Sequence, residues 1–391
     1  MKITAIRTLL CHAWRTNWLF VKVMTDVDGL WGVGEATLEY KEEATVGACR
    51  DLERELIGRN PLQIEAIWQD AYRDAYWRGG PVLMSALSAV DMALWDILGK
   101  ELGVPVWQLF GGKVREEVPC YANAWFASAR TPEQFGEKAS AAVERGFHAL
   151  KWDPFGSAWR SLDRNAYTQA MACVREVSRA VGDRAGVMIE GHGRFDLPTA
   201  AHIARGLEEY DVLWFEEPII PDSIESLARL RREINVPVAF GERLFGMNAF
   251  RTLLEAGAAD YIQPDVSHAG GLSELRRIAA LAETYHVPIC PHNPSGPVAN
   301  AATLQLAASL PNFYLLETMA TDVPWRREVC DEEVRLHNGC MTIPSRPGLG
   351  IELNEQEIAK HPWQPISLRH YKGTLTDIRP ENATSFFRED P

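Results

Sequence analysis

Six side chains that could carry acid–base or metal chemistry recur at a nearly constant spacing in the second half of the chain. They are Glu190, Glu216, Glu242, Asp265, His292 and Glu317. Each closes a short apolar run, and the steps between them are 26, 26, 23, 27 and 25 residues. A step of about 25 residues is the length of one strand–helix unit, so the spacing predicts repeated βα architecture. The carboxyl ends of the strands of a (β/α) barrel meet on one face. We therefore expect these residues to share one pocket.

The three glutamates predict a divalent-metal site. Glu190, Glu216 and Glu242 offer hard oxygen ligands without a thiolate, the donor set that suits Mg²⁺. Three ionised acids aimed at one point would repel one another without a cation. The alternative is that they are separate ion-paired acids at loop starts, which would not account for their common phase. Spacing alone leaves Glu216 and Glu217 open, because adjacent strand residues face opposite sides.

Two histidines are candidates for proton transfer. Asp265 and His292 end neighbouring strands, and a carboxylate beside an imidazole orients the ring and raises its basicity. This pair is expected to be a general base. His192 lies two residues after Glu190 and would face the same pocket as a second acid–base group. The alternative for a lone histidine is a core or loop position, which we expect for His268.

Three further residues near the predicted strand ends each have two possible interpretations. Lys151, in the segment ALKWD, could hold a substrate carboxylate, and its alternative is a surface lysine. Glu317 could donate a hydrogen bond to a carboxylate if its neighbours keep it protonated. Cys290 lies two residues before His292, which raises the possibility of a Cys/His nucleophile. A packed strand cysteine is the interpretation that we favour.

Short apolar segments between Val118 and Glu317 are expected to be the strands that position these residues. They are VPCYANAW, HALKWD, GVMIE, VLWFE, VAFGE, DYIQPD, VPICPH and NFYLLE. Amphipathic segments such as AYTQAMACVREVSRAV and SIESLARLRREI lie between them and predict helices. The pattern is that of an α/β barrel.

The N-terminal third differs in pattern. Residues 1–36 alternate as strands with a hairpin signal at Asp28-Gly29, and residues 41–110 carry helical periodicity. Strands followed by a run of helices predict an α+β unit. The GVG of WGVGEA is interpreted as hairpin backbone and not as a nucleotide cradle. The segment RPGLGIEL (346–353) predicts a turn and a strand, and the tail from Ile366 contains no motif.

Composition narrows the class of protein. The chain has 391 residues and a formal charge of -13, which argues against nucleic acid as a partner. Anionic substrates stay open, because a bound cation can invert the local field. The seven cysteines are scattered without a CxxC, which fits reduced cytosolic thiols. The N-terminus does not resemble a signal peptide and no apolar run approaches a membrane span, so we expect a cytoplasmic protein.

The motifs EGHGRF, WFEEP, GERLF, QPDVSHAGG and PHNPSGP together resemble the enolase superfamily in its mandelate racemase subgroup. The similarity covers nearly the whole chain and is strongest to the gluconate/galactonate type of sugar-acid dehydratase. It implies an α+β capping domain over residues 1–118, with a C-terminal return at about 346–391. It also implies a modified (β/α)7β TIM-like barrel over residues 119–345. Relatives commonly form even-numbered homo-oligomers, often octamers, around sites for small molecules.

The resemblance also implies roles for the polar residues. Glu216 rather than Glu217 would be a Mg²⁺ ligand, beside the other two glutamates. Asp265 and His292 would form the dyad that takes the proton α to the substrate carboxylate. His192 would be the acid for the leaving hydroxide. The implied reaction abstracts the C2 proton of an aldonate, eliminates the C3 hydroxyl and gives a 2-keto-3-deoxy acid.

Other positions follow from the same likeness. Glu317 matches the residue that hydrogen-bonds the substrate carboxylate or the enediolate, and Lys151 belongs to the expected catalytic set. Asn17 and Trp77 lie in capping segments that shape specificity, and Arg243 is a further expected substrate-binding residue.

Two departures from the family pattern bear on the reaction. Glu190 stands where many relatives have Asp, and Asp153 stands where the racemases carry the second lysine of a KxK pair. Losing that lysine removes the usual base on one face of the substrate, which favours elimination. The alternatives are a lactone cycloisomerase, or an epimerase or racemase acting through the same enediolate. More distant alternatives are a non-catalytic scaffold and a barrel aldolase that uses Lys151.

Overall fold

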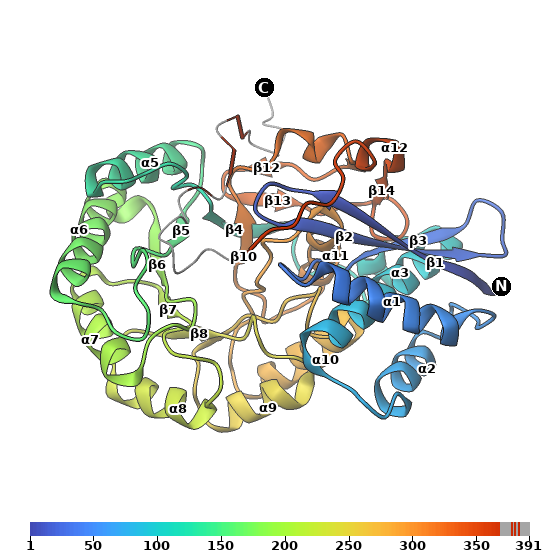
Figure 1. Ribbon diagram of the computed structural model, residues 1–391, viewed down its shortest axis with the longest axis horizontal. Coiled ribbons are helices and arrows are strands. Elements are labelled where there is room, and N and C mark those ends of the chain that lie inside the picture. Colours follow the sequence, from blue (N-terminus) through green and yellow to red (C-terminus); the bar gives the residue numbers. More distant parts are fainter. Residues whose placement is uncertain (368–376, 378, 381, 384–391) are drawn as a thin grey trace.

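The chain forms an N-terminal α+β domain beside a barrel-type domain, as Figure 1 shows. The computed structural model describes residues 1–367, 377, 379, 380, 382 and 383. The expected fold class, an α/β barrel with an α+β N-terminal domain, is confirmed. The boundaries drawn at residues 118 and 345 stay predictions.

The N-terminal sheet is a three-stranded antiparallel meander. It consists of β1 (Ile3–His12), β2 (Asn17–Thr25) and β3 (Trp31–Glu35) in that order. Gly29 sits in the expected hairpin between β2 and β3 with φ 73°, which a glycine adopts without steric cost. The turn between β1 and β2 brings residues 13–16 to the edge of the barrel mouth.

A run of helices follows this sheet, and the first and third of them cover one of its faces. They are α1 (Glu42–Leu56), α2 (Ile64–Gln69) with a following π-helical turn (Asp70–Asp74), α3 (Gly80–Leu102) and α4 (Val106–Leu109). A Cβ at Gly32 or Gly34 would lie 1.9 Å from a backbone oxygen of α3. The two glycines therefore let β3 approach α3 closely, and their interpretation as hairpin backbone is confirmed.

Helix α3 is long and apolar enough to cross a membrane by length and composition, which the sequence analysis did not expect. Its most apolar window is 78% buried inside the protein, as is typical of a core helix. Its apolar side chains pack against the sheet and against α10 (Gly271–Thr284). The expected cytoplasmic location and homo-oligomeric state stay predictions.

Parallel strands form the ring of the barrel. They are β4 (Glu117–Asn123), β5 (Ala149–Trp152), β6 (Gly186–Glu190), β7 (Trp214–Glu216), β8 (Val238–Phe240), β9 (Tyr261–Ile262) and β10 (Leu316–Met319). They pair in sequence order, and β10 pairs with β4 to close the ring. The expected strand VPICPH is reduced to bridges from Ile289 to Ile262 and Phe313. It still occupies the seventh place in the ring.

Helices follow the first seven places and cover the outside of the barrel, as α5 to α9 do at the left of Figure 1. They are α5 (Pro132–Glu144), α6 (Arg164–Val181), α7 (Leu197–Leu207), α8 (Ile224–Glu233), α9 (Met247–Glu255), α10 and α11 (Pro297–Ala307). Side-chain caps start several of them, as Asp163 does for α6 and Ser223 for α8. Short 3-10 turns lie at Gly182–Arg184, Glu208–Tyr210 and Pro324–Arg327.

The C-terminal segment folds back between the two domains. It contains β11 (Cys330–Glu332), β12 (Leu336–His337), β13 (Cys340–Thr342), β14 (Ile351–Leu353) and α12 (Glu355–Ile358). Strand β13 pairs with β4, and β14 pairs with β11. The turn and strand expected in RPGLGIEL are present, and Glu352 there accepts a hydrogen bond from Trp31 of the N-terminal sheet (3.1 Å).

Candidate active site

A cavity of about 510 Å³ lies where the strand ends of the barrel face the N-terminal domain. The predicted residues that line it are Lys151, Glu190, His192, Glu242, Arg243, His292 and Glu317. Glu216 and Asp265 lie directly behind them and are almost fully buried. The spacing argument is therefore right in bringing these distant positions to one place.

The three predicted ligands form one carboxylate cluster. Oxygen atoms of Glu190, Glu216 and Glu242 all lie within 4.8 Å of one another. Glu190 and Glu216 end adjacent strands and are direct neighbours in the register of β6 and β7. Burial and then the charge of Glu190 raise the pKa of Glu216 well above its usual range. The cluster therefore resists carrying its full negative charge unless a cation is close.

The chain supplies one cation itself. Lys151 extends from β5 and is 2% exposed. Its Nζ lies 3.2 Å from Glu190 and 3.0 Å from Glu317, and it also pairs with Glu216. Burial lowers the pKa of Lys151, but the carboxylates outweigh burial and raise that pKa well above its usual value. The surface alternative for Lys151 is wrong, and the lysine stays charged among the acids.

The side chains of Glu216 and Glu217 point in different directions, and this distinguishes the two residues. Glu217 has φ 38° and its side chain turns to Arg243, with which it forms an ion pair. Burial and then Glu242 raise the pKa of Glu217 to about 8, although Arg243 acts in the opposite direction. Arg243 Nε also lies 3.7 Å from Glu242. Arg243 thus lines the cavity while engaging two glutamates, and its substrate-binding role stays a prediction.

Asp265 and His292 form the expected carboxylate–imidazole pair. The Nδ1 atom of His292 lies 2.7 Å from Asp265, and its Nε2 atom points to Glu242 at 3.4 Å. Burial lowers the pKa of His292, but Glu242 and the hydrogen bond with Asp265 outweigh burial and raise that pKa well above its usual value. An imidazole oriented by a carboxylate with its other nitrogen facing the cavity has the geometry of a general base.

A second pair of the same kind faces it, which the sequence analysis did not foresee. The Nδ1 atom of His192 lies 2.6 Å from Asp153, the residue in place of the second lysine. Asp153 also accepts from Arg194 at 2.7 Å and from the backbone of Phe155 at 2.8 Å. Burial lowers the pKa of His192, but Glu190 and Asp153 outweigh burial and raise it. The sequence signal that could have predicted this pair is the aspartate two residues after Lys151, at the end of the same strand.

Glu317 does not have the protonation state that the sequence analysis considered. It accepts hydrogen bonds from Asn123 Nδ2 (2.8 Å) and from the backbone of Asn293 (3.0 Å). Burial raises the pKa of Glu317, but Lys151 and His292 outweigh burial and lower it. Both carboxylate oxygens of Glu317 thus accept hydrogen bonds in this structure, and its expected contact with a substrate carboxylate stays a prediction.

Two predicted specificity residues do not line the cavity. Asn17 is buried in the N-terminal domain, where it bonds Glu42 and the backbone of Gln364. Trp77 is 79% exposed and lies beside a separate pocket. The segment containing Asn17 was the right one, because Arg15 and Thr16 line the cavity instead. Arg15 and Thr16 lie half-buried in the turn between β1 and β2, whereas Asn17 begins β2 and is fully buried.

Further residues of the cavity escaped prediction. Glu39 and Tyr40 reach it from the segment after β3, and Asn123 reaches it from the end of β4. His268 is 4% exposed and lines the cavity with Nε2 3.8 Å from Asp265. It lies in the turn between β9 and α10, so the expected loop position is confirmed, although the side chain is buried. Cys290 is fully buried in an apolar cluster with Tyr121 and Trp214, so the packed strand cysteine is confirmed.

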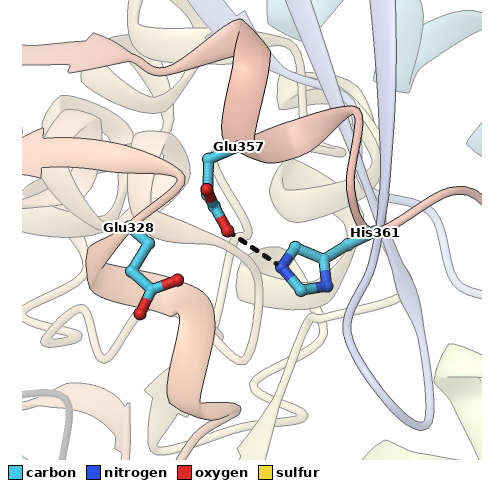
Figure 2. A group of neighbouring side chains, drawn as sticks. All are labelled: Glu328, Glu357 and His361. Carbon is cyan, nitrogen blue, oxygen red and sulfur yellow. Dashed lines mark hydrogen bonds and ion pairs between the residues drawn. The ribbon is translucent and has the colours of Figure 1, made fainter.

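A second group of possible ligands lies outside the cavity. Figure 2 shows Glu328, Glu357 and His361, whose ligand atoms also lie within 4.8 Å of one another. Glu357 is already engaged by His361 at 3.3 Å and by Lys360. Because these partners satisfy its charge, the group is best explained as a local ion-pair network.

Comparisons with known proteins agree with this geometry. The domain described as "Mandelate racemase / muconate lactonizing enzyme, N-terminal domain" matches residues 8–111. The domain described as "Enolase C-terminal domain-like" matches residues 134–357. The chain belongs to the enolase superfamily, in its mandelate racemase subgroup. The resemblance seen in the motifs is therefore confirmed.

Curated relatives within this superfamily are dehydratases by name. The D-gluconate dehydratase of Thermoproteus tenax is 37% identical over 91% of this chain and 72% of its own length. The D-galactonate dehydratase of Pectobacterium atrosepticum is 37% identical over 91% of this chain and 93% of its own.

Solved structures show the same architecture. An enolase-superfamily member from Salmonella Typhimurium superposes with a TM-score of 0.88 at 30% identity, over 92% of this chain and 98% of that one. A mandelate racemase/muconate lactonizing enzyme-like protein from Roseovarius sp. TM1035 also gives 0.88, at 32% identity over 95% and 97%.

The carboxylate cluster fits the magnesium that this superfamily uses. All three ligands are oxygen donors, and the carboxylates of Glu190 and Glu216 are buried close together, so a bound cation would offset their mutual repulsion. A cation beside Glu242 would also offset the largest influence that raises the pKa of His292. The enolase-superfamily site thus has both the donor set and the electrostatic need for a divalent ion.

Proposed function

We propose that this protein is a Mg²⁺-dependent sugar-acid dehydratase that acts on an aldonate-type carboxylate. The names of relatives over most of the chain support the reaction class. The observation that carries the proposal is the placement of two carboxylate–imidazole pairs. His192 follows the third strand of the ring and His292 the seventh, so they face each other across the mouth. Such a pair can act on two faces of one bound substrate.

The proton at C2 is removed by His292. Its Nε2 atom faces the cavity and Asp265 holds the opposite nitrogen, so the ring accepts the proton in a fixed orientation. The electron pair of the C2–H bond moves into the enediolate. Magnesium, when bound to the three glutamates, supplies positive charge beside the substrate carboxylate and so lowers the cost of this step. Lys151 contributes a second fixed charge nearby.

The hydroxyl at C3 leaves on the other side. The hydrogen bond from His192 Nδ1 to Asp153 raises the pKa of His192 and favours the protonated ring, so His192 donates a proton to the departing oxygen. The C3–O bond breaks, water is released and the enol formed between C2 and C3 tautomerises to a 2-keto-3-deoxy acid. The two histidines thus have opposite protonation states at the start of one turnover.

The variant His292→Asn tests the assignment of the base. We expect it to lose dehydration by at least about 10²-fold, the usual contribution of a positioned base, and to lose exchange of the C2 hydrogen with deuterated solvent. Binding of Mg²⁺, measured by calorimetry, should persist because the three glutamates are untouched. Retained turnover would remove His292 from the mechanism. Wild-type product analysis decides the reaction, because a cycloisomerase or epimerase releases no net water and forms no keto acid.

A further inference from the structure

Two arginines from opposite ends of the chain meet at the cavity. Arg15 lies in the turn between β1 and β2, and Arg379 lies near the C-terminus, and both line the cavity that holds the catalytic residues. The Arg379 side chain is only 6% exposed. Burial lowers the pKa of Arg379, and the charges of Arg326 and Arg15 add to that effect. Asp322 acts in the opposite direction on this pKa, and the two arginines share one wall of the cavity.

The described tail residues are tied to both domains. Arg379 Nε donates to the backbone oxygen of Thr321 (2.9 Å), in the loop after β10. The backbone oxygen of Asp377 accepts from Trp14 Nε1 (3.1 Å), beside Arg15 in the N-terminal turn. The carboxylate of Asp377 pairs with Arg130 in the loop after β4. These contacts hold Arg379 over the edge of the cavity between the barrel and the N-terminal domain.

The carboxylate beside Arg379 is shared with a second arginine. Asp322 lies 3.8 Å from Arg379 Nε, but it also pairs with Arg326 at 3.0 Å, so two guanidinium groups share one carboxylate. Glu39 lines the same cavity. Burial raises the pKa of Glu39, although His268 and His292 act in the opposite direction, and this favours its neutral form. Positive charge is therefore concentrated on the side of the cavity formed by Arg15 and Arg379.

The cavity accordingly has two chemically different sides. The barrel side carries the glutamates, Lys151 and the two histidines, where the proposed function places the substrate carboxylate and C2. The side formed by the N-terminal turn and the tail carries the arginines. Guanidinium groups bind carboxylate and phosphate in paired hydrogen bonds, whereas a neutral hydroxyl compensates poorly for their loss of water.

We propose that Arg15 and Arg379 bind a second anionic group at the end of the substrate remote from C1. The preferred substrate would then be a sugar acid with two anionic ends, either an aldarate or an aldonate with a terminal phosphate. This inference rests on the proposed dehydratase function and narrows its substrate class. Gluconate and galactonate themselves end in a neutral hydroxyl. They would make their full set of contacts only with the barrel side of the cavity.

The test compares matched substrates with the full-length protein and Mg²⁺. Each hexonate in a panel of configurations is paired with the aldarate of the same configuration and with its 6-phosphate, and keto-acid product is measured. We expect kcat/KM for one of the dianionic partners to exceed that of the matched hexonate by roughly 10- to 100-fold, the range for a hydrogen bond to a charged group. The better partner identifies carboxylate or phosphate as the terminal group.

Variants assign the preference to the arginines. Arg379→Gln and Arg15→Gln should lower the ratio of dianionic to hexonate kcat/KM by roughly 10- to 100-fold, mainly through KM. Arg379→Lys should restore part of the ratio because it keeps the charge. Arg229→Gln is the matched control, since Arg229 pairs with Glu233 on the surface of α8 and does not line the cavity, and its ratio should match the wild type.

The possible results distinguish a failure of this inference from a failure of the proposed function. Turnover of hexonates with no dianionic preference overturns this inference and leaves the dehydratase function standing. A preference that survives both glutamine variants also overturns it. No dehydration of any panel member refutes the proposed function itself, and this inference with it.

Discussion

Replacing Asp153 with asparagine should separate the two halves of the proposed reaction. The Asp153 side chain is 1% exposed, lies 2.6 Å from His192 Nδ1 and accepts from Arg194 at 2.7 Å. Its hydrogen bond and charge, together with the charge of Glu190, raise the pKa of His192 against the effect of burial. The proposed general base, His292 with its partner Asp265, lies on the opposite side of the barrel. The substitution therefore acts on the acid and leaves the base in place.

The magnitude follows from the lost interaction. A hydrogen bond to a charged group contributes about 1.5–3 kcal/mol, which at about 1.36 kcal/mol per unit corresponds to a drop of about 1–2 units in the pKa of His192. The protonated fraction then falls by up to roughly 10- to 100-fold, with the full factor reached at a pH above the wild-type pKa, and kcat for dehydration should fall with it. Exchange of the C2 hydrogen with deuterated solvent depends on His292 and should stay near the wild-type rate.

The assay follows both events in deuterated buffer by NMR. Asp153→Asn also leaves Arg194 buried without its carboxylate, a change that costs about 3–5 kcal/mol of stability, so the melting temperature is measured first and kinetics are run well below it. His192→Asn should give the same split between exchange and dehydration. Asp163→Asn is the matched control, because Asp163 caps helix α6 at the surface and asparagine caps equally well. Equal loss of exchange and dehydration in a folded Asp153→Asn protein would refute the assignment of His192 as the acid.

Two further perturbations test the electrostatics. Mg²⁺ at about 100 times its dissociation constant should stabilise the fold by about 2.7 kcal/mol, seen as a higher melting temperature that Glu190→Gln largely abolishes; an unchanged melting temperature in the wild type would count against the metal site. Burial raises the pKa of Asp91 to about 7, although its hydrogen bonds with Ser273 oppose the shift. The native state therefore holds this proton more tightly than the unfolded chain. The associated stability is present below about pH 4 and is lost as the pH rises toward 7, by up to about 4 kcal/mol. Asp91→Asn cannot ionise and should show a flatter melting-temperature profile between pH 5 and 8, and a profile parallel to the wild type would refute this reasoning.

Periodicity predicted which polar residues meet at one cavity, because a parallel barrel converts sequence phase into spatial position. Glu190 and Glu216 become direct neighbours in the register of β6 and β7 because both close their strands. The same logic placed His292 although its strand is reduced to a bridge at Ile289. Regular pairing is not needed there, since the neighbouring strands already set the position of the chain.

The residues that line the cavity from the N-terminal turn and the C-terminal tail could not be predicted in the same way. Arg15 rather than Asn17 lines the cavity because the tight turn after β1 exposes one side chain and buries the other. Arg379 belongs to a tail without any motif, and only folding brings it to Thr321. Such loop and tail positions obey no period, so their sequence neighbourhood contains little information about where their side chains point.

Asp153 shows how one substitution can change the chemistry that a shared scaffold performs. A lysine at this place would offer a second base on the substrate face opposite His292, the arrangement needed for racemisation. The aspartate cannot take that role, because its carboxylate is committed to Arg194 and to Phe155 within the barrel wall. It does hydrogen-bond His192 and raise its pKa, which favours a proton donor on the face where a proton acceptor was lost. A face that donates protons favours departure of a hydroxyl, and the substitution therefore favours elimination over return of the proton to C2.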